Sequence, residues 1–543
     1  MTSGWTESQP DQTVHLYTAR PTFSCFTGMK EDINSSNISK TWRLGCLIYG
    51  LISSLFGFSL KIISELTQSH IQTLKSLSHF YGVYMYTTSV ALISVLFIFA
   101  WKQSKSTNFK AYDPHNGNLF LKAGMVIFGC GTCCYCIVRG GQEFNMIIKE
   151  DDCGDVGKFI MRVTLCIQTI MSISFVVTQS KRVFTMFIRQ AELALAHLVS
   201  ADLITCVEFV LDESEEKAVS LRISDNLTTG CSTLDVEEDE NIEILTTLFY
   251  PCIIEKSLIA AGFFCIMAIN VSQAKVIENR SSKEIVVGKE HLLEWNHHFY
   301  MKFSKTGAIL GTLVLFFTVG VIFCRKLTMP DDIYITISYR IFQCSLHLIN
   351  MLVFLFTNPK LSIRQKTSHF HNAIDVPLLM ISLGGLLQCM MFASVASWVA
   401  FLTINKASAK IEAAITIIDH SLHGIQAVIQ TLLIFNWLRL KAKFDTSYTR
   451  SAIFLLFGIN LSLWLMLMFE MDTIIVSKFE VALYSKLNWN LIVHILGPLA
   501  IFFHFHSTAC LFDVWFGSYF PSEENSNVEI IDKQSLFTIT KKD

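Results

Sequence analysis

Apolar stretches of about twenty residues recur about twelve times along the sequence, and this pattern restricts the fold more than any other feature. A helix of that length crosses the roughly 30 Å of hydrocarbon in a bilayer. The chain is 51% hydrophobic and 16% charged, with a mean hydropathy of +0.44, whereas a soluble domain has about 25% charged residues. We therefore predict an all-α polytopic membrane protein with spans near 43–66, 80–101, 119–139, 158–178, 190–211, 246–270, 304–325, 332–357, 374–402, 411–438, 450–471 and 488–516.

The basic residues predict the orientation of these spans. With both termini in the cytoplasm, the inside connections carry roughly 18 Lys and Arg and the outside connections roughly 10, as the positive-inside rule requires. Hydropathy alone argues against the fifth span, which contains Glu192, His197, Asp202 and Glu208. The charge count supports keeping it, because its removal would invert every later connection. We therefore expect twelve spans and cytoplasmic termini.

Polar segments predict how the chain is divided. The longest connection is charged and separates two sets of six spans. The first 40 residues contain no short apolar core followed by a cleavage site, so we expect no removable signal peptide. An outside connection contains Asn226-Leu227-Thr228, a candidate glycosylation site. The expected parts are a cytoplasmic N-terminal tail (1–42), a six-helix half (43–271), a cytoplasmic linker (272–303), a second six-helix half (304–516) and a cytoplasmic C-terminal tail (517–543).

The two sets of spans contain a weak internal repeat. Gln168-Thr169 recurs as Gln430-Thr431, Asp202-Leu203 as Asn460-Leu461, and Pro251 as Pro498. Because six is an even number, both halves would insert in the same orientation, related by an axis along the membrane normal. Such a duplication predicts either two similar pathways or one pathway at the interface between the halves.

Polar stripes run along two of the predicted spans. In the tenth span the stripe is spaced at i, i+4, i+7 and i+11, and in the eighth at i, i+4 and i+7, so each stripe lies on one face of its helix. Hydrogen bonding between helices would explain a single amide in such a position. A stripe that includes Asp and His favours a wet cavity, because a dry Asp requires a dedicated partner. The stripes are Asp419, His423, Gln426 and Gln430, and Gln343, His347 and Asn350.

Two titratable residues lie one turn from a proline inside a span. Glu255 follows Pro251, and His494 precedes Pro498. Their side chains titrate near pH 4.3 and about 6.5 when unperturbed, within the range of an acid-activated pathway. The alternative for Glu255 is a contact with Lys256 or a histidine that only fixes packing.

Three blocks of the sequence resemble the otopetrins, a family of proton channels with twelve helices per subunit. They occur in the family's order, which makes the resemblance more specific than any single block. The first is Tyr250-Pro251 with the following Ile254-Glu255-Lys256-Ser257-Leu258, and the second is Ile425-Gln426-Ala427 with Gln430-Thr431-Leu432. The third is His494 with Gly497-Pro498-Leu499-Ala500-Ile501-Phe502, Phe505-His506-Ser507, Cys510-Leu511 and Trp515.

The resemblance implies a homodimeric proton channel of the plasma membrane, with protons, membrane lipid and a sterol as expected partners. It implies that Glu255 and His494 take part in conduction. It also implies one constriction in each half, formed by Gln168, Asp202 and Tyr250 in the first and by Gln430, Asn460 and His494 in the second. The chain departs from the family pattern where Asp202 replaces a common Asn and where Phe503-His504 replaces a Tyr-Arg pair. An ionisable group at a constriction would change the pH dependence or add a cation site.

The residues themselves narrow the class of function. A narrow series of water, imidazole, carboxylate and amide groups passes protons and excludes hydrated metal ions, and the chain contains no potassium-filter motif. A proton-coupled secondary transporter is the alternative, with Pro251, Pro377 and Pro498 as possible helix breaks. We find no GxSxG, HExxH or phosphate loop, so we expect neither an enzyme nor a cofactor. A net charge of −2 gives no basic field for nucleic acid. We interpret the cysteines at 130–136 as packed thiols rather than metal ligands.

Overall fold

Twelve long helices and one short helix make up the described part of this computed structural model. The described residues are 29–66, 72–106, 119–148, 155–224, 240–272, 305–327, 333–363, 375–439, 442–444, 447–475 and 477–517. The first six helices are α1 (Met29–Leu66), α2 (Gln72–Ser106), α3 (Leu119–Ile148), α4 (Val156–Gln179), α5 (Ile188–Ser224) and α6 (Glu240–Ser272). The others are α8 (Lys305–Leu327), α9 (Ile333–Thr357), α10 (Asp375–Thr403), α11 (Ala407–Arg439), α12 (Ser447–Ile475), α13 (Lys478–Tyr484) and α14 (Lys486–Gly517).

Two three-residue strands also occur, at the ends of α9 and α11. Strand β1 (Leu361–Ile363) follows a 3₁₀ turn at Asn358–Lys360 and pairs antiparallel with β2 (Ala442–Phe444). The all-α class predicted from the sequence is therefore correct apart from this short ribbon. Residues 273–303 of the predicted linker, the candidate glycosylation site at Asn226 and most of both tails lie outside the described residues.

The predicted spans correspond to the twelve long helices, and eleven of these are long and apolar enough to cross a membrane. The doubtful fifth span is one of the eleven, as Ile188–Asp212 of α5. Helix α11 is not among them, because the polar stripe predicted for it lowers its hydropathy. It packs along α9 and α10, which are both candidate spans. Protein rather than lipid therefore covers much of its length.

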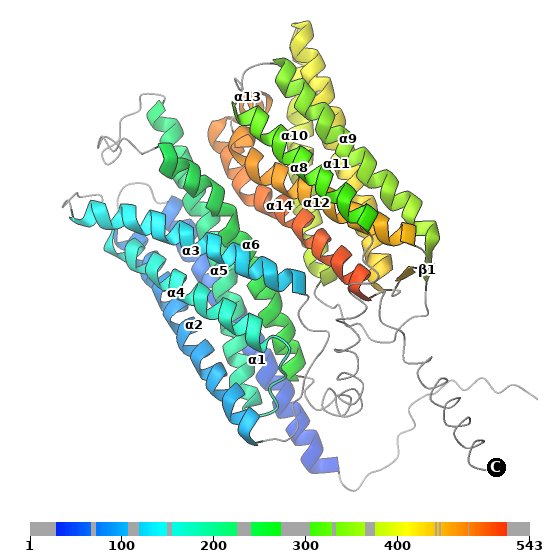
Figure 1. Cartoon of the computed structure of the whole chain (residues 1–543). Helices are drawn as coiled ribbons and strands as arrows, with labels where there is room; N and C mark the ends of the chain where they lie inside the picture. The colour runs from blue at the N-terminus through cyan, green and yellow to red at the C-terminus, as the bar shows by residue number, and fades with distance from the viewer. Residues whose placement is uncertain are drawn as a thin grey trace, which may run out of the picture.

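Six pairs of helices that pack in the first half have counterparts in the second. In the first half the pairs are α1 with α5, α2 with α4, α2 with α5, α3 with α4, α3 with α6, and α5 with α6. In the second they are α8 with α12, α9 with α11, α9 with α12, α10 with α11, α10 with α14, and α12 with α14. Figure 1 shows the two halves side by side. Gln168 and Gln430 therefore lie on equivalent helices, as do Asp202 and Asn460.

The three prolines do not divide their helices. Pro251 lies inside α6 and Pro498 inside α14, and both helices continue beyond them. Pro377 lies in the first turn of α10, where a missing backbone N–H costs no hydrogen bond. The helix breaks considered for a transporter site are therefore absent at these three positions.

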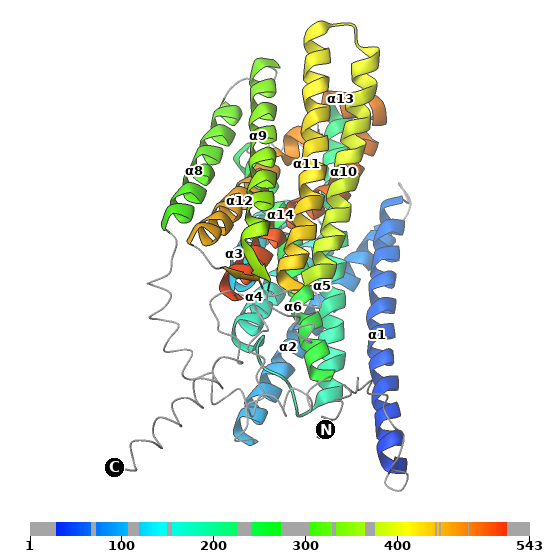
Figure 2. The same cartoon turned by 90° about the vertical axis from the view of Figure 1, so that its right-hand side faces the viewer.

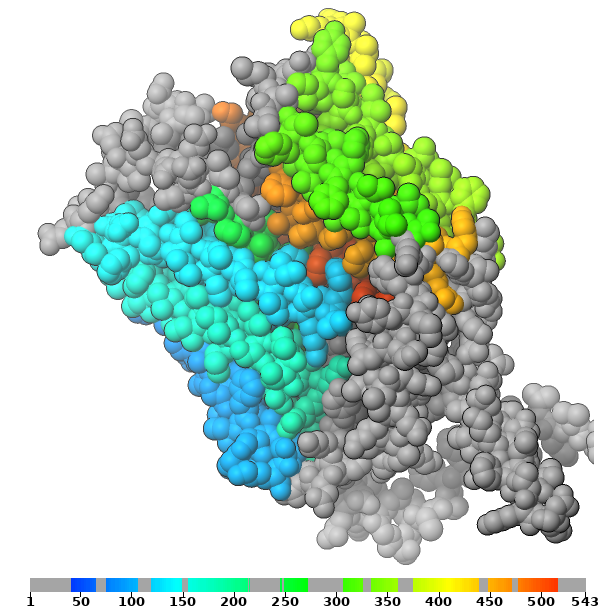
Figure 3. Space-filling model, in the orientation of Figure 1, coloured from blue at the N-terminus to red at the C-terminus, as the bar shows by residue number. Residues whose placement is uncertain are grey.

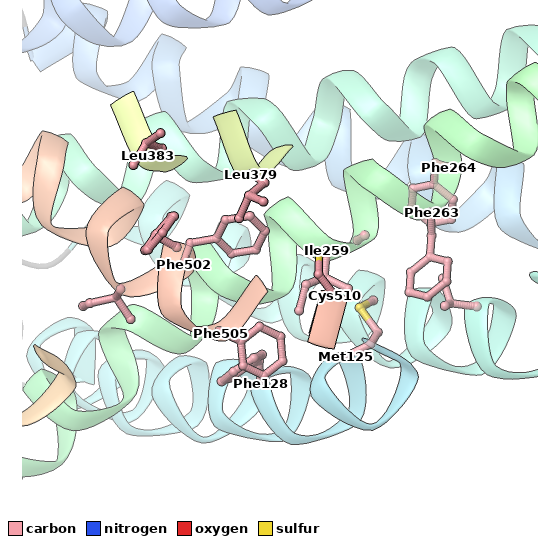
Figure 4. Close-up of a cluster of buried hydrophobic side chains, with 14 of the residues drawn as sticks. Met125, Phe128, Ile259, Phe263, Phe264, Leu379, Leu383, Phe502, Phe505 and Cys510 are labelled. Carbon is pink, nitrogen blue, oxygen red and sulfur yellow. The ribbon is translucent and has the colours of Figure 1, made fainter. Parts of the chain in front are cut away.

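Aromatic packing around α14 joins the halves. The Phe505 ring lies 5.2 Å from that of Phe120 and 4.8 Å from that of Phe128, measured between ring centroids. Gly124 allows this approach, since a Cβ there would lie 2.5 Å from Phe505 Cζ. Figure 4 shows Phe505 beside Phe128, with Phe502 directed toward Leu379 of α10. Figure 3 shows α12 and α14 between the surfaces of α3 and α8.

Apolar side chains cover the outside of the bundle and polar ones gather inside, the reverse of a soluble protein. Leu47 and Leu51 of α1 are 70% and 60% exposed, and Phe316 and Phe317 of α8 are 71% and 63% exposed. Figure 2 shows α1 and α8 at opposite edges of the molecule. Such surfaces suit contact with lipid, and they leave the buried polar groups to form the site.

Candidate functional site

Three buried side chains meet at the centre of the first half and form the N-half triad: Gln168 of α4, Asp202 of α5 and Lys256 of α6. Lys256 Nζ donates to Asp202 Oδ1 at 2.8 Å and to Gln168 Oε1 at 3.0 Å. Gln168 Nε2 donates to Ser172 Oγ at 3.1 Å and lies 3.5 Å from Asp202 Oδ1. The predicted pairing of Gln168 with Asp202 is therefore present, with a lysine ammonium between them.

The equivalent place in the second half holds the C-half triad: Gln430 of α11, Asn460 of α12 and His504 of α14. Gln430 Nε2 donates to Asn460 Oδ1 at 2.8 Å, and His504 Nδ1 lies 3.4 Å from the same oxygen. His504 thus contacts the α12 residue as Lys256 contacts the α5 residue. The two triads differ in charge, because an Asp–Lys ion pair in one is replaced by an amide and an imidazole in the other.

The two polar stripes predicted in α9 and α11 face each other. His347 Nδ1 lies 3.3 Å from Gln426 Oε1, and Asn350 Nδ2 donates to Gln430 Oε1 at 3.0 Å. Gln426 Nε2 donates to the same Gln430 oxygen at 2.6 Å. These bonds connect the stripes to the C-half triad.

A pair of imidazoles extends the series from α11 to α14. His423 Nε2 lies 2.9 Å from His504 Nε2, so that one ring donates a proton and the other accepts it. The His347 ring stacks on His423 with centroids 4.1 Å apart. We call the connected set of His347, Asn350, His423, Gln426, Gln430, Asn460 and His504 the C-half network.

A cavity of about 40 Å³ opens beside the network. His347, His423 and His504 line it. A water molecule needs roughly 10–15 Å³ on this measure, so the cavity has room for two or three waters. Its polar imidazoles supply the hydrogen-bond partners that a buried water needs.

A mouth cluster lies at the same cavity: Arg340, Gln343, Asp419 and Glu470 line it, and Arg325 joins them through Glu470. Arg340 Nη1 donates to Asp419 Oδ2 at 3.2 Å, and Arg325 Nη1 donates to Glu470 Oε1 at 2.6 Å. Gln343 links the two pairs, since it accepts from Arg340 at 3.0 Å and donates to Glu470 at 2.7 Å. Asp419 therefore has the dedicated partner that a buried carboxylate requires.

Glu480 of α13 lies outside the membrane-spanning segments and lines the same cavity. Burial raises the pKa of its carboxyl group above the ordinary value, and a hydrogen bond from the Ser477 hydroxyl opposes this effect. The group consequently changes charge at a higher pH than an exposed glutamate.

The other predicted pathway residues lie at the interface between the halves. The rings of Tyr250 and His494 lie 6.0 Å apart, so these side chains meet each other rather than joining one triad each. His494 Nδ1 lies 2.8 Å from the carbonyl oxygen of Asn490. The contact of Glu255 with Lys256 considered from the sequence is also absent, because Lys256 bonds to Asp202 and Gln168.

Glu255 is buried, and neither carboxyl oxygen has a hydrogen-bond partner among the described residues. The indole of Trp464, on α12 of the other half, is the group beside it. A buried carboxyl without a partner is costly and unusual, which is a reason to examine it for function.

The family model described as Otopetrin matches residues 120–243 and 228–505, and these ranges contain every residue of both triads. The chain belongs to the otopetrin family. The proton channel OtopLc of Drosophila melanogaster is 20% identical to this otopetrin over 454 residues. The alignment covers 75% of this chain and 28% of the fly protein, so this otopetrin spans less than a third of that relative's length.

Sequence reasoning on this otopetrin predicted Asp419 and Gln343 of the mouth cluster but missed Arg325, Arg340 and Glu470, and it missed the contacts of Lys256 with Asp202 and Gln168. A lysine inside an apolar span was itself a signal, because such a charge needs a partner on another helix. Arg340 carried a similar signal, since it precedes Gln343 and His347 by three and seven residues and shares their face.

Proposed function

We propose that this otopetrin is a channel that conducts protons across the membrane. The observation that carries the proposal is the C-half network, in which seven side chains from α9, α11, α12 and α14 are connected by hydrogen bonds beside a cavity. An imidazole accepts a proton on one nitrogen and releases one from the other, so the His423–His504 contact suits proton transfer. Amides such as Gln430 orient water but retain no charge.

The volume of the cavity beside the C-half network favours protons over metal ions as the conducted species. A cavity with room for two or three waters is too small for a sodium or potassium ion with its hydration shell. A proton needs no such shell, because it moves along hydrogen bonds from one group to the next. The printed name of the fly relative, a proton channel, supports this choice, and no finding favours the transporter alternative.

The membrane, the orientation and the oligomeric state of the channel are also part of the proposal. We infer a plasma-membrane location with both termini cytoplasmic, supported by the distribution of Lys and Arg among the connections. That topology gives the mouth cluster and Glu480 an extracellular position, where external pH would modulate the channel. A homodimer in contact with lipid, including a sterol, is supported by the family resemblance and by the apolar faces of α1 and α8.

The proposal is tested by whole-cell current and cytosolic pH in cells that express the chain. External pH is stepped from neutral to about 5, with sodium replaced by an impermeant cation. We expect a sodium-independent inward current that reverses near the proton equilibrium potential and acidifies the cytosol. A saturable flux that requires a second solute would instead establish a transporter.

A further inference from the structure

We propose that protons pass through the C-terminal half alone, because the Lys256–Asp202 ion pair closes the equivalent path in the N-terminal half. This inference rests on the proposed function as a proton channel. It assigns the conducting path to the C-half network and gives Lys256 the role of a fixed electrostatic plug.

The N-half triad has an ammonium group where the C-half triad has the His504 imidazole. Lys256 Nζ donates to an oxygen of both partners, at 2.8 Å to Asp202 and at 3.0 Å to Gln168. Both members of the ion pair have an exposed fraction of 0%. An ammonium group has three donors and no acceptor, so it cannot take a proton from a neighbouring water. The attraction between the ammonium and the Asp202 carboxylate is strong in a low-dielectric interior, so the pair stays closed.

The two triads also differ in whether a cavity reaches them. A cavity among the described residues of the first half has a volume of about 10 Å³ and is lined by residues such as Lys61, Tyr81 and Glu208, but by no member of the N-half triad. That volume holds one water at most. The cavity in the second half has about 40 Å³ and reaches His504 of the C-half triad directly.

The C-half triad has no fixed charge at the position of Lys256. From the cavity, the series runs from His423 to His504 at 2.9 Å, to Asn460 at 3.4 Å and to Gln430 at 2.8 Å. Two of these groups are imidazoles that can both accept and donate a proton. Arg340 also lines the cavity, and Asp419 balances its charge at 3.2 Å.

A matched pair of substitutions distinguishes the halves. Gln168→Leu and Gln430→Leu remove equivalent amides from the two triads and have similar volume effects. In cells with equal surface expression, we expect Gln430→Leu to lower the acid-evoked proton current by about tenfold or more, and Gln168→Leu to change it by less than about twofold. Loss of current in Gln168→Leu with retention in Gln430→Leu would overturn the proposal, as would equal partial losses in both.

A rescue experiment tests Lys256 itself. Asp202→Asn combined with Lys256→Gln removes both charges at once, which avoids leaving one buried charge unpaired. Placed in the Gln430→Leu background, the pair should restore a proton current through the first half. The control is that the variant reaches the cell surface in the same oligomeric state as the unmodified protein. If that holds and the current does not recover, Lys256 is not what closes the first half. Absence of proton current from the unmodified chain would instead refute the proposed function, on which this inference depends.

Discussion

Lys256 Nζ lies 2.8 Å from Asp202 Oδ1, and neither side chain has any exposed surface. At the equivalent place in the other half, Gln430 and Asn460 meet through neutral amides at 2.8 Å. The two halves therefore share one arrangement of helices but differ in their buried polar side chains. The difference lies in two side chains rather than in the packing of the helices.

The buried pair should make a strongly non-additive contribution to stability. Lys256→Met alone leaves Asp202 unpaired, so we expect a loss of about 3–5 kcal/mol, whereas Asp202→Asn with Lys256→Met should cost far less. Thermal unfolding of the detergent-solubilised protein measures both. Lys478→Met is the control, because Lys478 also lies 2.8 Å from a carboxylate, that of Glu412, but is 63% exposed. Its loss should cost less than about 1 kcal/mol, and an equal cost for both lysines would contradict the prediction.

His423→Phe should interrupt the imidazole series while preserving ring stacking with His347. We expect proton current to fall by about tenfold or more, because the ring can no longer exchange a proton with His504 at 2.9 Å. His506→Phe is the matched control, since His506 is a buried α14 histidine that lies 3.1 Å from the Asp375 carbonyl oxygen and outside the network. Current density normalised to surface protein is the measurement. Equal losses in the two variants would point to a folding defect.

Glu480→Gln should alter the pH dependence of the current with a defined sign. Burial raises the pKa of this carboxyl group, so below that pKa it is neutral and the variant should match the unmodified channel. Above it, the unmodified cavity carries a negative charge that attracts protons, and the variant does not. The ratio of variant to unmodified current should therefore fall as external pH rises. Glu143→Gln, in the N-terminal half, should leave that ratio constant across the same pH series.

Asp155 should stabilise the start of α4 in a pH-dependent way. Its Oδ1 accepts from the Gly157 and Lys158 N–H groups, and its Oδ2 lies 2.8 Å from His79 Nδ1. The His79 hydrogen bond is the main cause that lowers the pKa of Asp155 from 3.8 to about 2. A depressed acid pKa contributes stability above about pH 4, which is lost as pH falls toward 2.

Asp155→Ala should accordingly cost about 0.5–2 kcal/mol near neutral pH, and the difference from the unmodified protein should shrink below about pH 4. Asp155→Asn retains a capping oxygen and should lose less. Thermal unfolding in detergent between neutral pH and about pH 3 measures both variants. A difference that grows on acidification would contradict the assigned role.

Much of the site was predictable because its residues repeat with the helical period. The spacing of Asp419, His423, Gln426 and Gln430 fixed one face of α11, and the facing stripe on α9 followed from the same rule. The partner of Lys256 was not predictable, since it depends on which face of α5 turns toward α6. The meeting of Tyr250 with His494 depends likewise on how the two halves dock.

The sequence by itself determined the twelve long helices and the polar stripes, because hydropathy and helical periodicity act within about twenty residues. Three motif blocks in the family's order indicated the family. Only the tertiary structure decided that Lys256 joins Asp202 and Gln168, that His423 reaches His504, and that a cavity of about 40 Å³ lies beside them in the second half. These contacts join residues distant in the chain. They are set by the rotation and register of packed helices, which no local pattern specifies.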